Sequence, residues 1–192
     1  MRKSMSEAWI ETYTGKRFPL LEPDEALLCI EDIAHALSNQ CRWTGHTKFF
    51  YSVAEHSVLV SRYSNPIDQL EGLLHDASEA YMADLNRPLK HCTPIGPPYF
   101  EVEKRIMQAV VNKFGLSSAM PASVKEADNF ILWAEKQQLM PPTDWRNPGD
   151  WDVQPPNPKF SIPKIGGYFP RAAENLFLDT FEQLTKNLKA IN

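Results

Sequence analysis

The sequence predicts an all-α fold with a short β-hairpin at its N-terminus. Apolar residues recur at helical spacing in several long segments, which indicates amphipathic helices. Residues 9–18 instead alternate large and polar side chains around Gly15-Lys16, the pattern of a hairpin. At 192 residues with 43% hydrophobic content, the chain is long enough to form one globular domain, residues 1–192.

Composition excludes several classes of protein. The formal net charge of −4 argues against a general nucleic-acid surface, and no stretch approaches the roughly 20 apolar residues of a membrane span. The three cysteines, Cys29, Cys41 and Cys92, lack CxxC spacing, which is typical of reduced thiols. We therefore expect a cytoplasmic protein that binds neither a nucleic-acid polymer nor a membrane. We also expect a homo-oligomer.

Residues 30–39 are expected to form the first helix, because Ile30, Ile33 and Leu37 recur at helical spacing. His35 lies beside this apolar stripe. We interpret it as a hydrogen-bonded histidine in the core or at its boundary rather than as a metal ligand.

The next segment, residues 41–46, is a short loop that contains Arg42, Trp43, Gly45 and His46. Side chains of these types bind phosphate, stack on aromatic rings and donate protons. The loop is therefore a candidate substrate-binding segment. The alternative is a surface connector that is anchored by its tryptophan.

A second helix is expected over residues 52–63. Ser52 is its N-cap, and Glu55 three residues later completes a capping box. His56 shares its face with apolar residues such as Val53. It therefore points inward, either as a metal ligand on a core helix or as a buried structural histidine.

A third helix is expected over residues 66–82, and it carries an unusual group of polar side chains. His75 and Glu79 lie one turn apart on one face, and Asp76 projects about 100° from His75. Unpaired charge is costly inside a protein, so this group needs a partner. A divalent cation would satisfy it.

Residues 84–90 are expected to lead away from this helix as a loop. Arg87 and Lys90 lie there, either to hold an anionic substrate or as ordinary solvated charges. Residues 94–98 are interpreted as a rigid proline-containing loop, and residues 99–114 as a helix closed by glycine.

The helix expected over residues 121–140 supplies a further candidate ligand. Asp128 lies between apolar residues, and acidic residues are rarely buried without a partner. Glu135, near the end of this helix, is interpreted as ordinary surface. The proline-rich, aromatic residues 141–170 predict an ordered wrap or lid, and residues 171–189 close the chain as a helix.

Four candidate metal ligands thus come from three helices: His56, His75, Asp76 and Asp128. Two imidazoles and two carboxylates suit a first-row divalent ion, so we expect one bound transition metal, Zn, Co or Mn. Such a set leaves one or two positions on the ion for water and a phosphate oxygen.

This H…HD…D pattern resembles that of the HD-domain metal-dependent phosphohydrolases. The strings that carry it are CRWTGH (41–46), SVAEHS (52–57), HDASEAY (75–81) and KEAD (125–128). The chain is most similar to the small bacterial and phage branch with the 5′-deoxynucleotidases and the phage dATP triphosphohydrolases. The resemblance covers roughly residues 7–140 and the final helix, and it implies an HD-domain helical bundle.

The resemblance also implies roles for individual residues. Glu79 corresponds to the family's catalytic acidic residue, which handles the proton of the attacking water. Arg42 and Lys90 correspond to its phosphate-binding cations, and Trp43 to the aromatic residue that packs the nucleoside. Gly45 stands where a larger apolar residue can line the sugar pocket.

The implied activity is metal-dependent hydrolysis of a small-molecule 2′-deoxynucleotide, which releases the deoxynucleoside plus phosphate or triphosphate. The resemblance favours deoxyadenosine nucleotides such as dATP. The alternative is a non-catalytic, metal-containing module for nucleotide sensing or protein interaction. Glu79, Arg42 and Lys90 argue against that alternative, because a structural metal site needs none of them.

Overall fold

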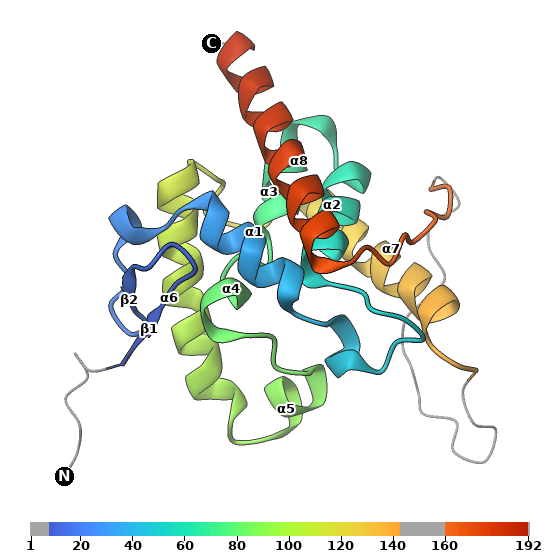
Figure 1. Ribbon diagram of the computed structural model, residues 1–192, viewed down its shortest axis with the longest axis horizontal. Helices are drawn as coiled ribbons and strands as arrows, with labels where there is room; N and C mark the ends of the chain where they lie inside the picture. Colours follow the sequence, from blue (N-terminus) through green and yellow to red (C-terminus); the bar gives the residue numbers. More distant parts are fainter. Residues whose placement is uncertain (1–7, 143–159, 192) are drawn as a thin grey trace.

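The computed structural model describes residues 8–142 and 160–191, and it confirms the all-α fold with a short N-terminal β-hairpin (Figure 1). In chain order the helices, 3-10 turns (η) and strands are β1 (Trp9–Glu11), β2 (Arg17–Pro19), η2 (Glu25–Leu27), α1 (Ile30–Asn39), η3 (Arg42–Gly45), α2 (Val53–Tyr63), η4 (Pro66–Asp68), α3 (Gln69–Leu74), α4 (Glu79–Met82), α5 (Arg87–Cys92), α6 (Gly96–Phe114), α7 (Ala122–Leu139) and α8 (Pro170–Ile191).

The hairpin closes one end of the helical core. Its strands are antiparallel with Ile10 opposite Phe18, and Phe18 is fully buried. Thr14, in the turn, donates its backbone N–H and its hydroxyl to the carboxylate of Asp32 at 2.7 and 3.0 Å. Because Asp32 lies in the first turn of α1, these bonds fix the hairpin against that helix.

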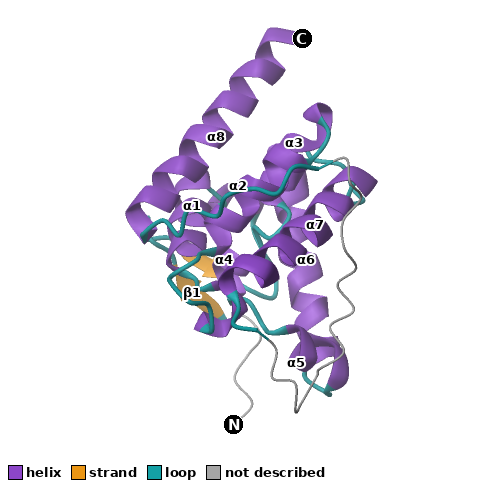
Figure 2. Cartoon of the chain, turned by 90° about the vertical axis from the view of Figure 1, so that its right-hand side faces the viewer, coloured by secondary structure: helices purple, strands orange, loops and turns teal. Residues whose placement is uncertain are grey.

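Helix α2 lies in the middle of the molecule (Figures 1 and 2). Ser52 caps it by accepting the backbone N–H of Glu55, and residues 53–61 are all buried. The helix contacts α1, α3, α7 and α8. One side of α2 therefore belongs to a core shared with α1, α3, α6 and α8, and the other to a core shared with α7.

The prediction of a single helix over residues 66–82 is wrong. Residues 75–78 form a tight turn between α3 and α4, in which the N–H groups of Ala77 and Glu79 donate to carbonyls three residues back, both at 3.0 Å. The buried Ala77 and Ser78 are small enough for this turn to pack against the core. The turn carries the His-Asp pair toward α2.

Two further boundaries differ from the prediction. Residues 87–92 form the short helix α5 rather than a loop, because Asn86 caps it by accepting the N–H of Leu89 at 3.2 Å. Helix α6 begins at Gly96, within the expected loop. Its prolines stand in the first turn, where a missing N–H costs nothing. The helix ends at Gly115 in a left-handed conformation, as predicted.

Much of the expected wrap, residues 143–159, lies outside the described residues. The following segment packs against α2 and α7. Phe160 stacks on Phe130 of α7 at a centroid distance of 4.8 Å, and Ile165 is buried in the same core.

Glu55 holds this segment and does not complete the predicted capping box. Its carboxylate is 2% exposed and accepts the backbone N–H groups of Gly166, Gly167 and Tyr168 at 2.7, 3.1 and 2.9 Å. Three backbone donors satisfy a buried carboxylate better than the single N–H of the helix cap. The prediction of Ser52 as the N-cap is confirmed.

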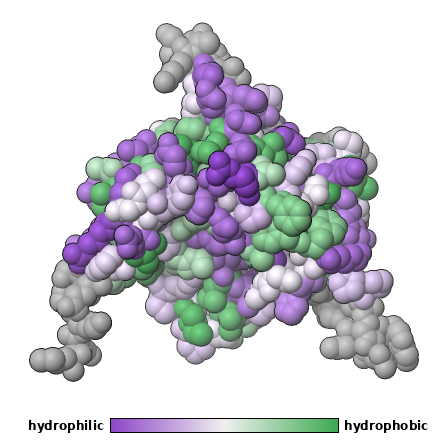
Figure 3. Space-filling model, in the orientation of Figure 1, coloured by the Kyte–Doolittle hydropathy of each residue, from purple (hydrophilic) through white to green (hydrophobic). Residues whose placement is uncertain are grey.

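On the face of the molecule drawn in Figure 3, apolar residues form separate patches among hydrophilic ones. Across residues 8–142 and 160–191, no helix has both the length and the apolar character that crossing a membrane requires. The three cysteines are free thiols.

Candidate metal centre

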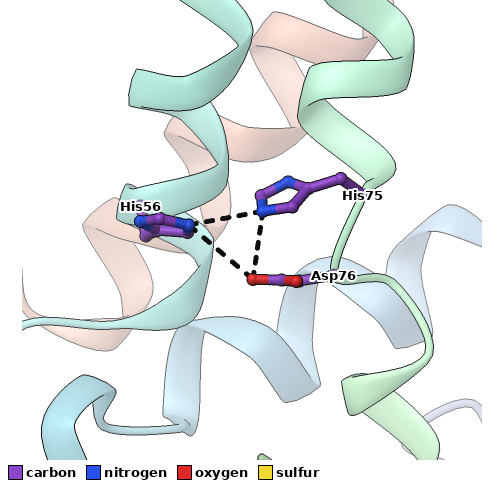
Figure 4. Close-up of side chains that lie close together, drawn as sticks. All are labelled: His56, His75 and Asp76. Carbon is purple, nitrogen blue, oxygen red and sulfur yellow. Dashed lines mark hydrogen bonds and ion pairs between the residues drawn. The ribbon is translucent and has the colours of Figure 1, made fainter. Parts of the chain in front are cut away.

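Three of the predicted ligands converge at the end of α3 (Figure 4). His56 comes from the buried helix α2, and His75 and Asp76 come from the tight turn after α3. The Nε2 atoms of the two histidines are 3.3 Å apart. An Asp76 Oδ2 atom lies 3.2 Å from the Nε2 of His75 and 3.7 Å from that of His56.

The other nitrogen of each imidazole has a fixed partner. His75 Nδ1 donates to the carbonyl of Gly72 at 2.8 Å, and His56 Nδ1 donates to the carboxylate of Glu135 at 2.6 Å. In neutral rings this arrangement leaves both Nε2 lone pairs facing each other. One proton or one cation between them would satisfy both.

The spacing of these atoms fits a divalent cation. Ligand atoms about 2.1 Å from an ion lie about 3.0 to 3.4 Å apart when they subtend 90–109° at it. The observed separations of 3.2 and 3.3 Å fall in this range, and 3.7 Å is slightly longer. His56, His75 and Asp76 therefore form a group that can hold a metal ion.

Asp128, the fourth predicted ligand, lies at the edge of this group. Its Oδ1 is 3.5 Å from the Nε2 of His56, and its Oδ2 pairs with Lys125 at 3.1 Å. The side chains of Asp76 and Asp128 are both 22% exposed, whereas His56 is fully buried. The centre thus has a buried imidazole side and an open carboxylate side, through which a ligand can approach.

The electrostatic environment keeps both carboxylates ionised. Burial raises the pKa of Asp76, but His75, His56 and Arg42 outweigh it and hold that pKa well below its usual range. Burial likewise opposes ionisation of Asp128, but the hydrogen bond of His56 and the charges of His75, His56 and Lys125 outweigh it and lower the pKa. Ionised carboxylates are the form that binds a metal.

The prediction that Glu135 is ordinary surface is wrong. Its side chain is fully buried and accepts from four groups: His56 Nδ1 and Tyr51 Oη on one oxygen, and Trp43 Nε1 and Arg42 on the other. The sequence contained a signal for the burial of Glu135, because this residue shares a helix face with Asp128 and Ile131.

The loop that contains Arg42 and Trp43 lies beside the centre. A guanidinium nitrogen of Arg42 is 3.3 Å from Glu135 and another is 3.8 Å from Asp76. The Nε1–H of Trp43 donates to Glu135 at 2.8 Å. Trp43 and Thr44 adopt positive φ angles of 56° and 53°, so the loop is held in a conformation that non-glycine residues adopt infrequently.

Glu79 lies one turn beyond the histidine-aspartate pair, at the start of α4. It is 4% exposed, and within the described residues its Oε2 has no hydrogen-bond partner. Burial, together with the nearby Asp76 and Asp84, raises the pKa of Glu79 well above its usual range. A buried carboxyl group of this kind is suited to accept and return a proton.

Lys90 lies on the far side of Glu79. Its ammonium pairs with Glu79 at 3.5 Å, Asp84 at 3.5 Å and Glu103 at 3.2 Å. The structure therefore brings Lys90 to the catalytic candidate, but surrounds it with carboxylates rather than leaving it as an isolated cation.

The remaining candidates lie outside the cluster. No described contact joins the side chain of His46 or Arg87 to it, and both residues are exposed. Gly45 adopts a φ of 79° in the loop after Trp43. His35 stacks on Tyr13 and pairs with the buried Glu174 at 3.3 Å, as expected for a hydrogen-bonded boundary histidine.

The chain resembles known proteins over most of its length. "Uncharacterized protein YfdR" of Escherichia coli (strain K12) is 34% identical over 179 residues, which cover 93% of this chain and 97% of that protein. The chain belongs to the YfdR family. "Uncharacterized protein RCAP_rcc00048" of Rhodobacter capsulatus is 42% identical over 132 residues, 64% of this chain and 66% of that protein. No protein-family model matches the chain. The names of both relatives state no activity, so the function of this chain must be inferred from the geometry of the site.

Proposed function

We propose that the protein is a metal-dependent hydrolase of 2′-deoxynucleotides of the HD-domain type. The observation that carries the proposal is the cluster itself. Two imidazole Nε2 atoms and one carboxylate converge within ligand distance, and a buried carboxyl with an unpartnered oxygen lies one turn away. A purely structural metal site has no use for that second carboxyl.

His56, His75 and Asp76 would hold the ion, with Asp128 as the fourth ligand. When bound, a divalent cation supplies Lewis-acid polarisation of a phosphoryl oxygen and lowers the pKa of water. The open carboxylate side of the centre admits the phosphate.

Glu79 acts as the general acid–base. In its ionised form the carboxylate would take a proton from the attacking water, and its buried position and raised pKa favour the protonated form that would pass a proton to the departing 5′ oxygen. Lys90, 3.5 Å from Glu79, orients that carboxyl and neutralises charge at the phosphate end of the substrate.

Arg42 and Trp43 grip the substrate. Arg42 stands beside Asp76 and can reach phosphate oxygens from there. Trp43 offers a flat ring for the base, and its N–H bond to Glu135 fixes the orientation of that ring. Together they distinguish a nucleotide from inorganic phosphate.

A substrate panel tests the proposal. Deoxynucleoside mono- and triphosphates and the matching ribonucleotides are incubated with the protein and Zn, Co or Mn, and products are separated by chromatography. We expect deoxynucleoside plus phosphate or triphosphate, with little turnover of ribonucleotides. A protein that takes up metal and hydrolyses nothing on the panel would contradict the proposal and favour the nucleotide-sensing or interaction module.

A further inference from the structure

Glu135 connects the two halves of the candidate site. Its Oε1 accepts from the Nδ1–H of His56 at 2.6 Å and from the hydroxyl of Tyr51 at 2.9 Å. Its Oε2 accepts from the Nε1–H of Trp43 at 2.8 Å and from Arg42 at 3.3 Å. One oxygen therefore contacts the metal-ligand side, and the other contacts the loop that carries the substrate-binding candidates.

The carboxylate has little freedom to move. It is fully buried, and the bonds to four donors fill the lone-pair sites of both oxygens. The carboxylate is one of the contacts that hold the tryptophan loop, in which Trp43 and Thr44 adopt positive φ angles.

We propose that Glu135 is a positioning residue that couples metal binding to the grip on the nucleotide base. This inference rests on the proposed function. The Glu135 carboxylate holds His56 in the tautomer that presents Nε2 to the cluster, and it holds the Trp43 ring in place for the base. A change at Glu135 therefore weakens both kinds of binding, although the residue touches neither ligand.

The substitution Glu135→Gln tests this directly, because an amide cannot satisfy both pairs of donors. A glutamine has one acceptor oxygen and one NH₂ donor. If the NH₂ faces His56, the ring must accept at Nδ1 and carry its proton on Nε2, where it blocks a metal. If the NH₂ faces the loop, the fixed donors of Arg42 and Trp43 lose their acceptor.

Glu174→Gln is the matched control. Glu174 is also buried and also bonds a histidine Nδ1, that of His35 at 3.3 Å, but this pair lies outside the cluster. Both substitutions neutralise a buried carboxylate that bonds an imidazole. A difference between them reports on the position of Glu135 rather than on the loss of a buried charge.

Two binding measurements separate the effects. Calorimetry gives the affinity for Co²⁺. The ratio of the affinities for dAMP and deoxyribose 5-phosphate gives the contribution of the base, measured in a Glu79→Gln background so that neither ligand is consumed. Glu135→Gln is expected to lower the Co²⁺ affinity about 10- to 100-fold if its NH₂ faces His56, or to lower the base ratio about fivefold or more if its NH₂ faces the loop. Glu135→Asp withdraws the carboxylate from both pairs of donors and should lower both. Glu174→Gln should change neither by more than about threefold.

Loss of neither binding term in Glu135→Gln, or of only one of them in Glu135→Asp, would overturn the coupling. Glu135→Asp also serves as the test if Glu135→Gln does not fold. The aspartate keeps the charge that Arg42 requires and withdraws the carboxylate by about 1.5 Å, so both losses are still expected. Failure of the Glu79→Gln parent to bind dAMP and deoxyribose 5-phosphate at all would instead refute the proposed function.

Discussion

His56 and His75 keep one ring nitrogen each for the cluster, because the other nitrogen is committed to Glu135 or to the Gly72 carbonyl. Asp76 completes the group from the open side of the centre. At the scale of single residues, the site thus divides into side chains that would touch the ion and groups that orient them.

Asp76→Ala should remove both turnover and bound metal while leaving the fold intact. The variant loses a charged ligand but no core packing, because the apolar contacts of α2 and α3 remain. Elemental analysis measures the bound metal, and circular dichroism measures whether the fold is intact. Asp179→Ala, on an exposed position of α8, is the control and should keep its metal. Undiminished metal in Asp76→Ala would remove Asp76 from the site.

Glu79→Gln should lower the rate by about 10²-fold or more, the range for loss of a general acid–base group. The amide keeps the shape of the side chain but cannot take up a proton. The metal content should not change, because Glu79 is not part of the ligand group. A rate close to that of the unaltered protein, measured at saturating substrate, would assign the proton to another group.

Glu135 shows most clearly which part of the site the sequence predicts and which part it does not. The H…HD…D spacing predicted the three side chains that converge, His56, His75 and Asp76, because each residue type and position was visible in the chain. The role of Glu135 was missed, since its partners Arg42 and Trp43 lie more than 90 positions away in the sequence. Helical periodicity placed Glu135 on the inner face but could not supply those partners.

At the scale of elements, periodicity predicted α1, α2 and α7 almost to the residue. Periodicity failed where local hydrogen bonds and caps determine the backbone conformation. Residues 75–78 keep helical spacing in the sequence. Only their hydrogen bonds, which reach carbonyls three rather than four residues back, reveal the break in the helix. Helix α5 depends on the cap at Asn86, and the start of α6 on prolines that a first turn tolerates.

Glu55→Gln should weaken the attachment of residues 166–168 to α2. An amide offers one acceptor oxygen to three backbone donors and turns its own NH₂ toward the others. Leaving buried donors unsatisfied costs about 1–3 kcal/mol, so the free energy of unfolding in urea should fall by that amount. Glu101→Gln, at an exposed position of α6, is the control. Equal stability of the two variants would contradict this assignment.

The contact between the hairpin and α1 should depend on pH through Asp32. Burial raises the pKa of this carboxyl, but hydrogen bonds from Cys29, Thr14 and Thr12 outweigh it and lower the pKa below its usual value of 3.8. Since the folded state has the lower pKa, the stabilisation is present above about pH 4 and is lost as the pH falls further.

Asp32→Asn should therefore be less stable than the unaltered protein at about pH 6, with the difference shrinking toward about pH 3. Urea unfolding at both pH values measures it. A difference that stays constant across this interval would mean that the ionised form of Asp32 is not favoured by folding.

At the scale of the whole molecule, α2 joins two apolar cores and carries His56 and Glu55 between them. One metal-ligand candidate, His56, and the bound segment 166–168 are therefore attached to the same buried helix. The single domain, the homo-oligomer and the cytoplasmic location stay predictions. Of the wrap expected over residues 141–170, residues 143–159 lie outside the described residues.

The proposed site requires His56, His75 and Asp76 to bind a divalent cation. Crystals grown with zinc and measured at the zinc absorption edge would locate the ion. We expect an anomalous peak about 2.0–2.2 Å from the Nε2 atoms of both histidines and from a carboxylate oxygen of Asp76. Zinc bound only elsewhere, with the two Nε2 atoms still in direct contact, would contradict it.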